Sequence, residues 1–248
     1  MSKQRILGKS IRFKTAISAE LLAPGMPSSP VLMFGFEPFL QFKENPSEKI
    51  VRSLNGTSVG GRKIIGRILP VDYGTIEKKI LTEIDSSSPS VVIGTGLAAG
   101  RSSLSIEKIA VNYKFSEEPD NKGKLQEGSL IDATAPDGIF SNIKPEEAAR
   151  RLNRAGIPAA VSLSAGAYLC NFAMFIIARE ASRRGFVGGF IHLPCDEEMA
   201  SKSEYRRFPF MGLDSMKRGV RSVIEQSIEL TIQAGGTTVA NARKRTKG

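Results

Sequence analysis

Short apolar runs alternate with stretches of helical periodicity along this chain. The predicted strands lie at residues 31–36, 63–69, 91–93, 159–163 and 187–193, with residues 104–113 also extended. The predicted helices lie at residues 75–84, 145–155, 168–184 and 211–233, and a short helix opens at Pro46. Because strands alternate with helices, the pattern predicts a single-domain, three-layer α/β/α fold with a mostly parallel twisted sheet.

Chain-breaking residues mark the start of this domain. Residues 24–30 read Pro-Gly-Met-Pro-Ser-Ser-Pro, which is typical of a linker. We therefore predict three parts: a flexible, basic N-terminal extension at 1–30, a folded domain at 31–234, and a basic C-terminal tail at 235–248. The longest apolar run, 172–178, is too short to cross a bilayer, and no secretory signal is recognisable.

The positive charge is concentrated at the two ends of the chain. The net charge is +10, yet residues 1–30 carry +4, residues 240–248 another +4, and everything between them only +2. This distribution favours solvated ends; weak binding to RNA or another polyanion is the alternative, and we expect no nucleic-acid or membrane partner. The chain has only two cysteines, Cys170 and Cys195, which fits a reducing cytoplasm better than a disulfide framework.

Three residues form a candidate catalytic group. Cys170 lies in the first turn of a predicted helix, where unpaired backbone N–H groups favour a thiolate. His192, the only histidine, ends a predicted strand and is the sole candidate for an imidazole base. Glu107 is an acid within an apolar stretch, suited to orienting that imidazole. Each also has a structural interpretation: a buried cysteine, a core histidine, and a surface acid paired with Lys108.

Two other interpretations use overlapping residues. Cys170, His192, Cys195 and Asp196 are candidate zinc ligands, although one His-x-x-Cys with a distant cysteine is a weak metal motif. Residues 94–100, Gly-Thr-Gly-Leu-Ala-Ala-Gly, partly match a dinucleotide-binding loop, but the third glycine comes one position late and an extended segment follows. We therefore predict neither a metal nor a cofactor.

Several segments, in order, resemble one enzyme family. They are Gly-Phe-Glu-Pro-Phe (35–39) with Asn-Pro-Ser (45–47), Gly-Leu-Ala-Ala-Gly-Arg (96–101) running into Ser-Ile-Glu-Lys-Ile-Ala-Val-Asn (105–112), Pro-Asp-Asn-Lys-Gly (119–123), Gly-Ile-Pro-Ala-Ala-Val-Ser (156–162), Ser-Ala-Gly-Ala-Tyr-Leu-Cys-Asn (164–171) and Gly-Phe-Ile-His-Leu-Pro (189–194). Together they resemble pyroglutamyl peptidase I, a family of cysteine peptidases also called pyrrolidone-carboxylate peptidases.

The resemblance implies an activity and a set of site residues. It implies hydrolysis of the amide bond after an N-terminal pyroglutamyl residue, through a thioester acyl-enzyme and a triad of Glu107, Cys170 and His192. It also implies a homo-oligomer, a tetramer, acting on peptides with N-terminal pyroglutamate. The substrate-binding residues that it implies are Phe36, Phe39, Leu97, Tyr168 and Leu169.

The chain departs from the family pattern at three places. Glu117 occupies a position where many members carry arginine, residues 194–198 read Pro-Cys-Asp-Glu-Glu rather than the family's Pro-Tyr-x-Pro-Glu-Gln, and the extension 1–30 is atypical. None of these changes touches the three triad residues. The Glu117 change motivates an alternative: a catalytically weak homologue that binds modified peptide N-termini or a partner.

Overall fold

A seven-stranded sheet forms the centre of the molecule in the computed structural model, which describes the backbone of residues 29–245 and the side chains of residues 29–233. The strand order is β10-β5-β11-β4-β1-β3-β2. The strands are β1 (Val31–Phe36), β2 (Ser58–Val59), β3 (Arg62–Leu69), β4 (Val91–Leu97), β5 (Leu104–Glu107), β10 (Ala159–Ser162) and β11 (Val187–Leu193). Strands β3, β1, β4 and β11 run parallel, so the predicted α/β fold with a mostly parallel sheet is confirmed.

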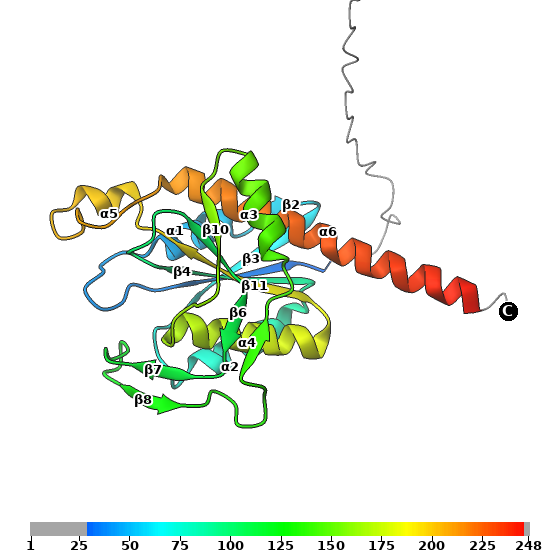
Figure 1. The fold of residues 1–248 in the computed structure, drawn as a ribbon, viewed down its shortest axis with the longest axis horizontal. Helices are drawn as coiled ribbons and strands as arrows, with labels where there is room; N and C mark the ends of the chain where they lie inside the picture. The colour runs from blue at the N-terminus through cyan, green and yellow to red at the C-terminus, as the bar shows by residue number, and fades with distance from the viewer. Residues whose placement is uncertain (1–28, 246–248) are drawn as a thin grey trace, which may run out of the picture.

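Helices cover both faces of the sheet, as Figure 1 shows. On one face lie α1 (Pro46–Leu54), α3 (Pro145–Arg154) and α6 (Leu213–Arg245); on the other lie α2 (Ile76–Ser87) and α4 (Leu169–Arg184). Strand β1 illustrates why its sequence is a continuous apolar run. Val31 and Met33 pack under the first group of helices, whereas Leu32 and Phe34 pack under α2 and α4.

Smaller elements lie outside the main sheet. Strand β6 (Ile109–Val111) pairs with β9 (Gly138–Phe140), and β7 (Lys114–Ser116) pairs with β8 (Gln126–Ser129), as two antiparallel ribbons beside α4. The apolar pattern of residues 104–113 predicts one extended segment, but the structure divides it between β5 and β6. These ribbons, and the short helix α5 (Glu197–Ser201), were not predicted because their residues show little apolar periodicity.

Two elements extend beyond their predicted ends. Strand β4 continues to Leu97 rather than stopping at residue 93. The last helix, predicted over 211–233, is helical from Leu213 to Arg245, so its backbone extends into the predicted tail at 235–248. The predicted extension 1–30 lies outside the described residues except for its last two.

No helix in the described part of the chain is both long enough and apolar enough to span a bilayer.

One topological expectation was wrong. The sequence predicts that the strand before Cys170 runs in the same direction as the His192 strand and lies beside it. Instead β10 pairs with β5, β5 is antiparallel to β11, and β5 lies between β10 and β11. The strand pattern alone cannot reveal this, because direction and order depend on packing between distant segments.

Candidate active site

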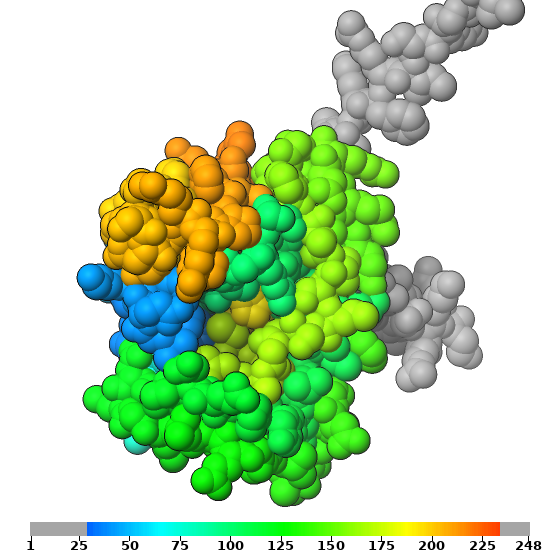
Figure 2. All heavy atoms as spheres, turned by 60° about the vertical axis from the view of Figure 1, so that its left-hand side comes forward, coloured from blue at the N-terminus to red at the C-terminus, as the bar shows by residue number. Residues whose placement is uncertain are grey.

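The candidate site lies where the parallel strands β1, β3, β4 and β11 end. Sites form at this edge in α/β sheets because the loops that follow the strands converge there. Figure 2 faces this edge and shows it hollowed between the blue segment after β1, the orange segment that follows α5, and the green β7–β8 ribbon. The residues that the sequence singles out gather around this hollow.

His192 and Glu107 share the sheet face that α4 covers. Side chains alternate along a strand, so His192 lies on the same face as Phe190, and the two rings pack edge to face with centroids 5.1 Å apart. Glu107 stands directly opposite Phe190 in the antiparallel β5–β11 pair, and therefore on that same face. The register thus brings a carboxylate beside the imidazole from a position 85 residues earlier.

The two side chains form a buried hydrogen-bonded pair. His192 Nδ1 lies 2.8 Å from Glu107 Oε1, and both side chains are almost wholly buried. Burial by itself raises the pKa of Glu107, but the contacts with His192, Ser162 and Arg101 outweigh it and hold that pKa below its usual value. An ionised carboxylate can only accept, so Nδ1 carries the proton and Nε2 is left with its lone pair.

Burial has the largest effect on the pKa of the His192 imidazole. It lowers the pKa of His192 below the ordinary value, against the raising effect of the Glu107 hydrogen bond. His192 is therefore neutral near pH 7 and can accept a proton. The structural interpretation of Glu107 as a surface partner of Lys108 is wrong, because Glu107 is fully buried and Lys108 pairs with Glu146 instead.

Cys170 reaches this pair from the start of α4. Helix α4 begins at Leu169, so Cys170 lies in its first turn, where the N–H groups have no partner within the helix. A β-carbon added at Gly96 would lie only 2.8 Å from Cys170 Sγ, and Gly96 stands beside His192 in the parallel β4–β11 pair. The absence of a side chain at Gly96 therefore makes room for the sulfur one strand away from the imidazole.

The thiol itself is neutral in this environment. Burial, reinforced by the nearby charge of Glu107, raises the pKa of the Cys170 thiol to about 12, and Arg101 opposes that rise. The sequence predicts a thiolate stabilised by the helix N-terminus, whereas desolvation, the largest cause of the raised pKa, favours the neutral thiol. Cys170 and His192 are therefore arranged as thiol and neutral imidazole.

A small pocket opens beside Cys170. It is lined by all five residues implied as substrate-binding, together with Cys170 and two residues that sequence reasoning missed: Phe36, Phe39, Leu97, Tyr168, Leu169, Cys170, Asn45 and Val71. The rings of Phe39 and Tyr168 lie 6.2 Å apart. Tyr168 donates a hydrogen bond to the Pro119 carbonyl, which ties the 119–123 loop to this pocket. Asn45 was visible in the sequence only as part of the Asn-Pro-Ser motif.

The space at Gly96 leads to a prediction about the sulfur. We expect Gly96→Ala to lower both stability, by about 1–3 kcal/mol as in other overpacked cores, and the peptidase activity that the family resemblance implies, because the new methyl group collides with Cys170 Sγ. Gly100→Ala is the matched control, since a β-carbon there meets nothing within 4 Å. Thermal unfolding and amidase rates measure both effects; unchanged values for Gly96→Ala would contradict this placement of the sulfur.

Neither alternative site is assembled. Among the described residues, no three histidine, cysteine or acidic side chains come together in a way that could hold a metal ion. Asp196 instead caps α5 by accepting from the Met199 N–H, and it pairs with Lys49. Gly94 and Gly96 lie inside strand β4 rather than in a loop before a helix, so residues 94–100 do not form a dinucleotide loop.

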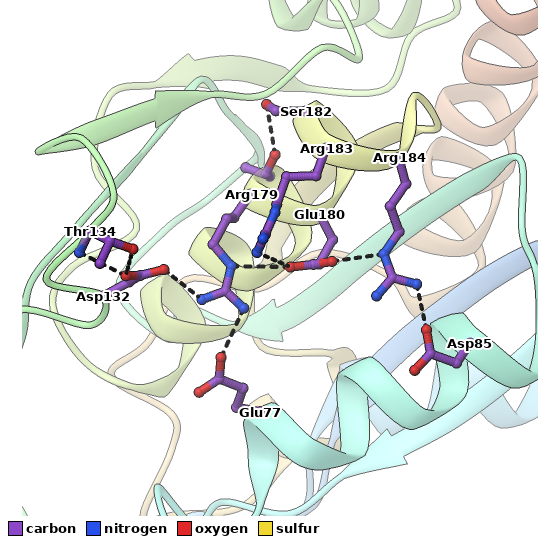
Figure 3. A network of polar contacts seen from close by, with 10 residues as sticks. Glu77, Asp85, Asp132, Thr134, Arg179, Glu180, Ser182, Arg183 and Arg184 are labelled. Atoms are coloured by element: carbon purple, nitrogen blue, oxygen red, sulfur yellow. Dashed lines mark hydrogen bonds and ion pairs between the residues drawn. The ribbon is translucent and has the colours of Figure 1, made fainter.

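A wider pocket elsewhere lacks catalytic groups. It has a volume of about 560 Å³ and lies between α4 and the β9 region, with Ile139, Phe140 and Arg179 in its lining. Figure 3 shows the Arg179 guanidinium held between Glu77, Asp132 and Glu180. Arg179 pairs with three carboxylates, and Arg183, the other arginine in the lining, pairs with Glu180, so both arginines of the pocket already have acidic partners.

Comparison with known proteins supports one family. A family model described as pyroglutamyl peptidase (Peptidase_C15) matches residues 29–230. The chain is 51% identical over 195 residues to a pyrrolidone-carboxylate peptidase of Saccharolobus islandicus, which covers 79% of this chain and 93% of that protein. It is 36% identical over 204 residues to the pyrrolidone-carboxylate peptidase of Pyrococcus furiosus, covering 79% of this chain and 98% of the relative.

Solved structures agree with this match. The chain resembles the crystal structure of pyrrolidone carboxyl peptidase from Pyrococcus furiosus with a TM-score of 0.78 and 36% identity, covering 82% of this chain and 99% of that one. The likeness therefore extends over almost the whole of the solved protein. The part of this chain that remains unmatched lies largely at its two ends.

Proposed function

This chain belongs to the pyroglutamyl peptidase family, whose members are cysteine peptidases, and we propose that it hydrolyses the amide bond after an N-terminal pyroglutamyl residue with Cys170, His192 and Glu107. The observation that carries the proposal is the buried Glu107–His192 pair beside the Cys170 sulfur, next to an aromatic pocket. Such an arrangement of nucleophile, base and orienting acid is suited to acyl transfer.

Proton transfer accompanies the attack in this mechanism. Cys170 and His192 begin as thiol and neutral imidazole, so Nε2 takes the thiol proton while sulfur bonds to the carbonyl carbon of pyroglutamate. The tetrahedral intermediate collapses as the C–N bond breaks, and His192 returns the proton to the leaving amine. Water, activated by His192, then hydrolyses the thioester and releases pyroglutamate.

Two parts of the surroundings support this reaction. The unpaired N–H groups in the first turn of α4 are suited to stabilise the oxyanion, an effect worth about 3–4 kcal/mol per donor in studied enzymes. Phe36, Phe39 and Tyr168 provide apolar and aromatic surface for a flat lactam ring. Glu107, hydrogen-bonded to Nδ1, stabilises the imidazolium that forms during attack.

A matched pair of substrates tests the proposal. We expect rapid release of a fluorogenic amine from its pyroglutamyl amide and little release from the prolyl amide, in which a methylene group replaces the ring carbonyl and the ring nitrogen is a protonated amine. Iodoacetamide should abolish the activity by labelling Cys170, both in the wild-type protein and in Cys195→Ser, because Cys195 is fully buried. Binding of the pyroglutamyl amide without turnover would instead favour the weak homologue, and inactivation that follows Cys195 labelling would refute the choice of nucleophile.

Assembly and location are further parts of the proposal. We expect a homo-oligomer, a tetramer by family resemblance, acting in the cytoplasm on peptides with N-terminal pyroglutamate. Large apolar side chains on the two ribbons or directly beside them are exposed and are the surface that subunit contacts would bury: Phe115, Leu125, Leu130 and Phe140. The domain boundaries at 1–30, 31–234 and 235–248 remain predictions, although the family match at 29–230 supports the central one.

A further inference from the structure

Arg101 makes two hydrogen bonds that join separate parts of the site. It lies in the turn that follows β4, and its side chain is 31% exposed. Nη1 donates to Glu107 Oε1 over 2.6 Å, and Nη2 donates to the Ser164 carbonyl over 2.9 Å. One planar guanidinium therefore spans two acceptors contributed by different segments, which a single ammonium group cannot reproduce in the same geometry.

The first of these bonds holds the carboxylate that contacts the imidazole. His192 and Arg101 donate to the same oxygen, Oε1. Within the described residues the other oxygen, Oε2, makes no hydrogen bond, although the Ser162 hydroxyl lies near enough to favour the charged form. Without Arg101, the fully buried carboxylate would keep only the hydrogen bond from His192 and the nearby Ser162 hydroxyl, at a considerable cost in desolvation.

The second bond, to the Ser164 carbonyl, holds the chain segment that leads to Cys170. Ser164 belongs to the segment 163–168, which crosses from β10 to the start of α4. Strand β10 is parallel to β5, but this pair runs antiparallel to β11, so the segment does not emerge at the edge where β1, β3, β4 and β11 end. The Arg101–Ser164 bond ties it to Glu107, and Cys170 follows six residues later.

We propose that Arg101 is a positioning residue for catalysis, whose guanidinium locks Glu107 against His192 and fixes the segment that leads to Cys170. This inference rests on the proposed function, since it assigns Arg101 a part in the same triad. Arg101 is not among the residues that line the substrate pocket; it acts through Glu107 and through the backbone of Ser164.

The charge of Arg101 also acts on the reacting pair. It lowers the pKa of the Cys170 thiol and the pKa of His192, whereas Glu107 raises both. The other titratable groups near Cys170 are Tyr73 and Tyr168, whose pKa values lie far above neutrality, so they stay uncharged. Removing the guanidinium should therefore shift the ionisation of both Cys170 and His192 towards higher pH.

Two variants separate charge from geometry. Both are made with Cys195→Ser, so that Cys170 is the only thiol. Arg101→Met removes the charge at similar length, whereas Arg101→Lys keeps the charge but cannot hold both acceptors. Arg52→Met, which removes an exposed arginine paired with Glu48 on α1, is the matched control for loss of one positive charge. The readouts are the pH dependence of Cys170 alkylation by iodoacetamide and of kcat/KM for the pyroglutamyl amide.

We expect Arg101→Met to shift the pH profile of Cys170 alkylation and the acid limb of the kcat/KM profile upward by about one pH unit. At a pH below the acid limb, this shift means about a tenfold loss of kcat/KM. Arg101→Lys should keep both profiles near those of the wild type and lose kcat several-fold with little change in KM. Arg52→Met should change nothing.

Unchanged profiles in Arg101→Met would overturn the proposal, whatever the effect on melting temperature. A Lys variant with wild-type kcat would overturn the geometric part. If Arg101→Met does not fold, wild-type behaviour of Arg101→Lys in every assay still refutes the positioning role. Alkylation needs no turnover, so a wild-type protein that is inactive on the amide would refute the proposed function while leaving this test in place.

Discussion

Cys170→Ser is expected to lower kcat/KM for a pyroglutamyl amide by about 10⁴–10⁶-fold, the range seen when a nucleophile is removed from comparable triads. Serine is smaller than cysteine and fits the space above Gly96, so the fold should persist. The loss arises because a hydroxyl is far harder to deprotonate than a thiol, and the buried His192, with its lowered pKa, is a weak base for that task.

Mass spectrometry provides a second measurement for this variant. Rapid quenching of the wild type with substrate should trap a thioester on Cys170, and none should form in Cys170→Ser. Cys195→Ser is the control because Cys195 is fully buried and its thiol pKa is raised to about 11 by burial. It should keep most of the activity. A Cys170→Ser protein with near-wild-type turnover would show that another group is the nucleophile.

Glu107→Gln is expected to lower the acylation rate by about 10²–10⁴-fold while the protein stays folded, on the analogy of acid-to-amide changes in triads. The amide is nearly isosteric, but it can favour the wrong imidazole tautomer and cannot stabilise the imidazolium. It also leaves the Arg101 guanidinium without its carboxylate. Substrate affinity should change little, because Phe36 and Phe39 line a separate pocket.

Single-turnover kinetics decide whether Glu107 has this role. His192→Ala should be at least as harmful as Glu107→Gln, and the double variant should lose little more, because members of a triad act as a unit. Near-wild-type acylation in Glu107→Gln would refute the orienting role. Asp196 is then the other acid to test, although the structure places it at the N-cap of α5, paired with Lys49.

Local patterns in the sequence account for much of this protein. Apolar runs predicted the strands and the alternation with helices, because a strand buried on both faces must be apolar throughout, as β1 is. The small number of reactive side chains limited the candidates for catalysis, because a chain with one histidine and two cysteines can assemble few catalytic groups. Glu107 was a candidate because it is an acid within an apolar stretch, and the ordered family motifs pointed to the same residue.

Only the tertiary structure decided how these residues meet. Strand order and direction place β5 between β10 and β11, so Glu107 faces Phe190 and reaches His192 across an antiparallel pair that no local pattern predicts. Position 96 holds a glycine because the Cys170 sulfur occupies the space that a side chain there would fill. The sequence assigned no role to Arg101, whereas in the structure its side chain reaches both Glu107 and the Ser164 carbonyl. Contacts between segments tens of residues apart depend on register and packing, which the periodicity of a single segment does not contain.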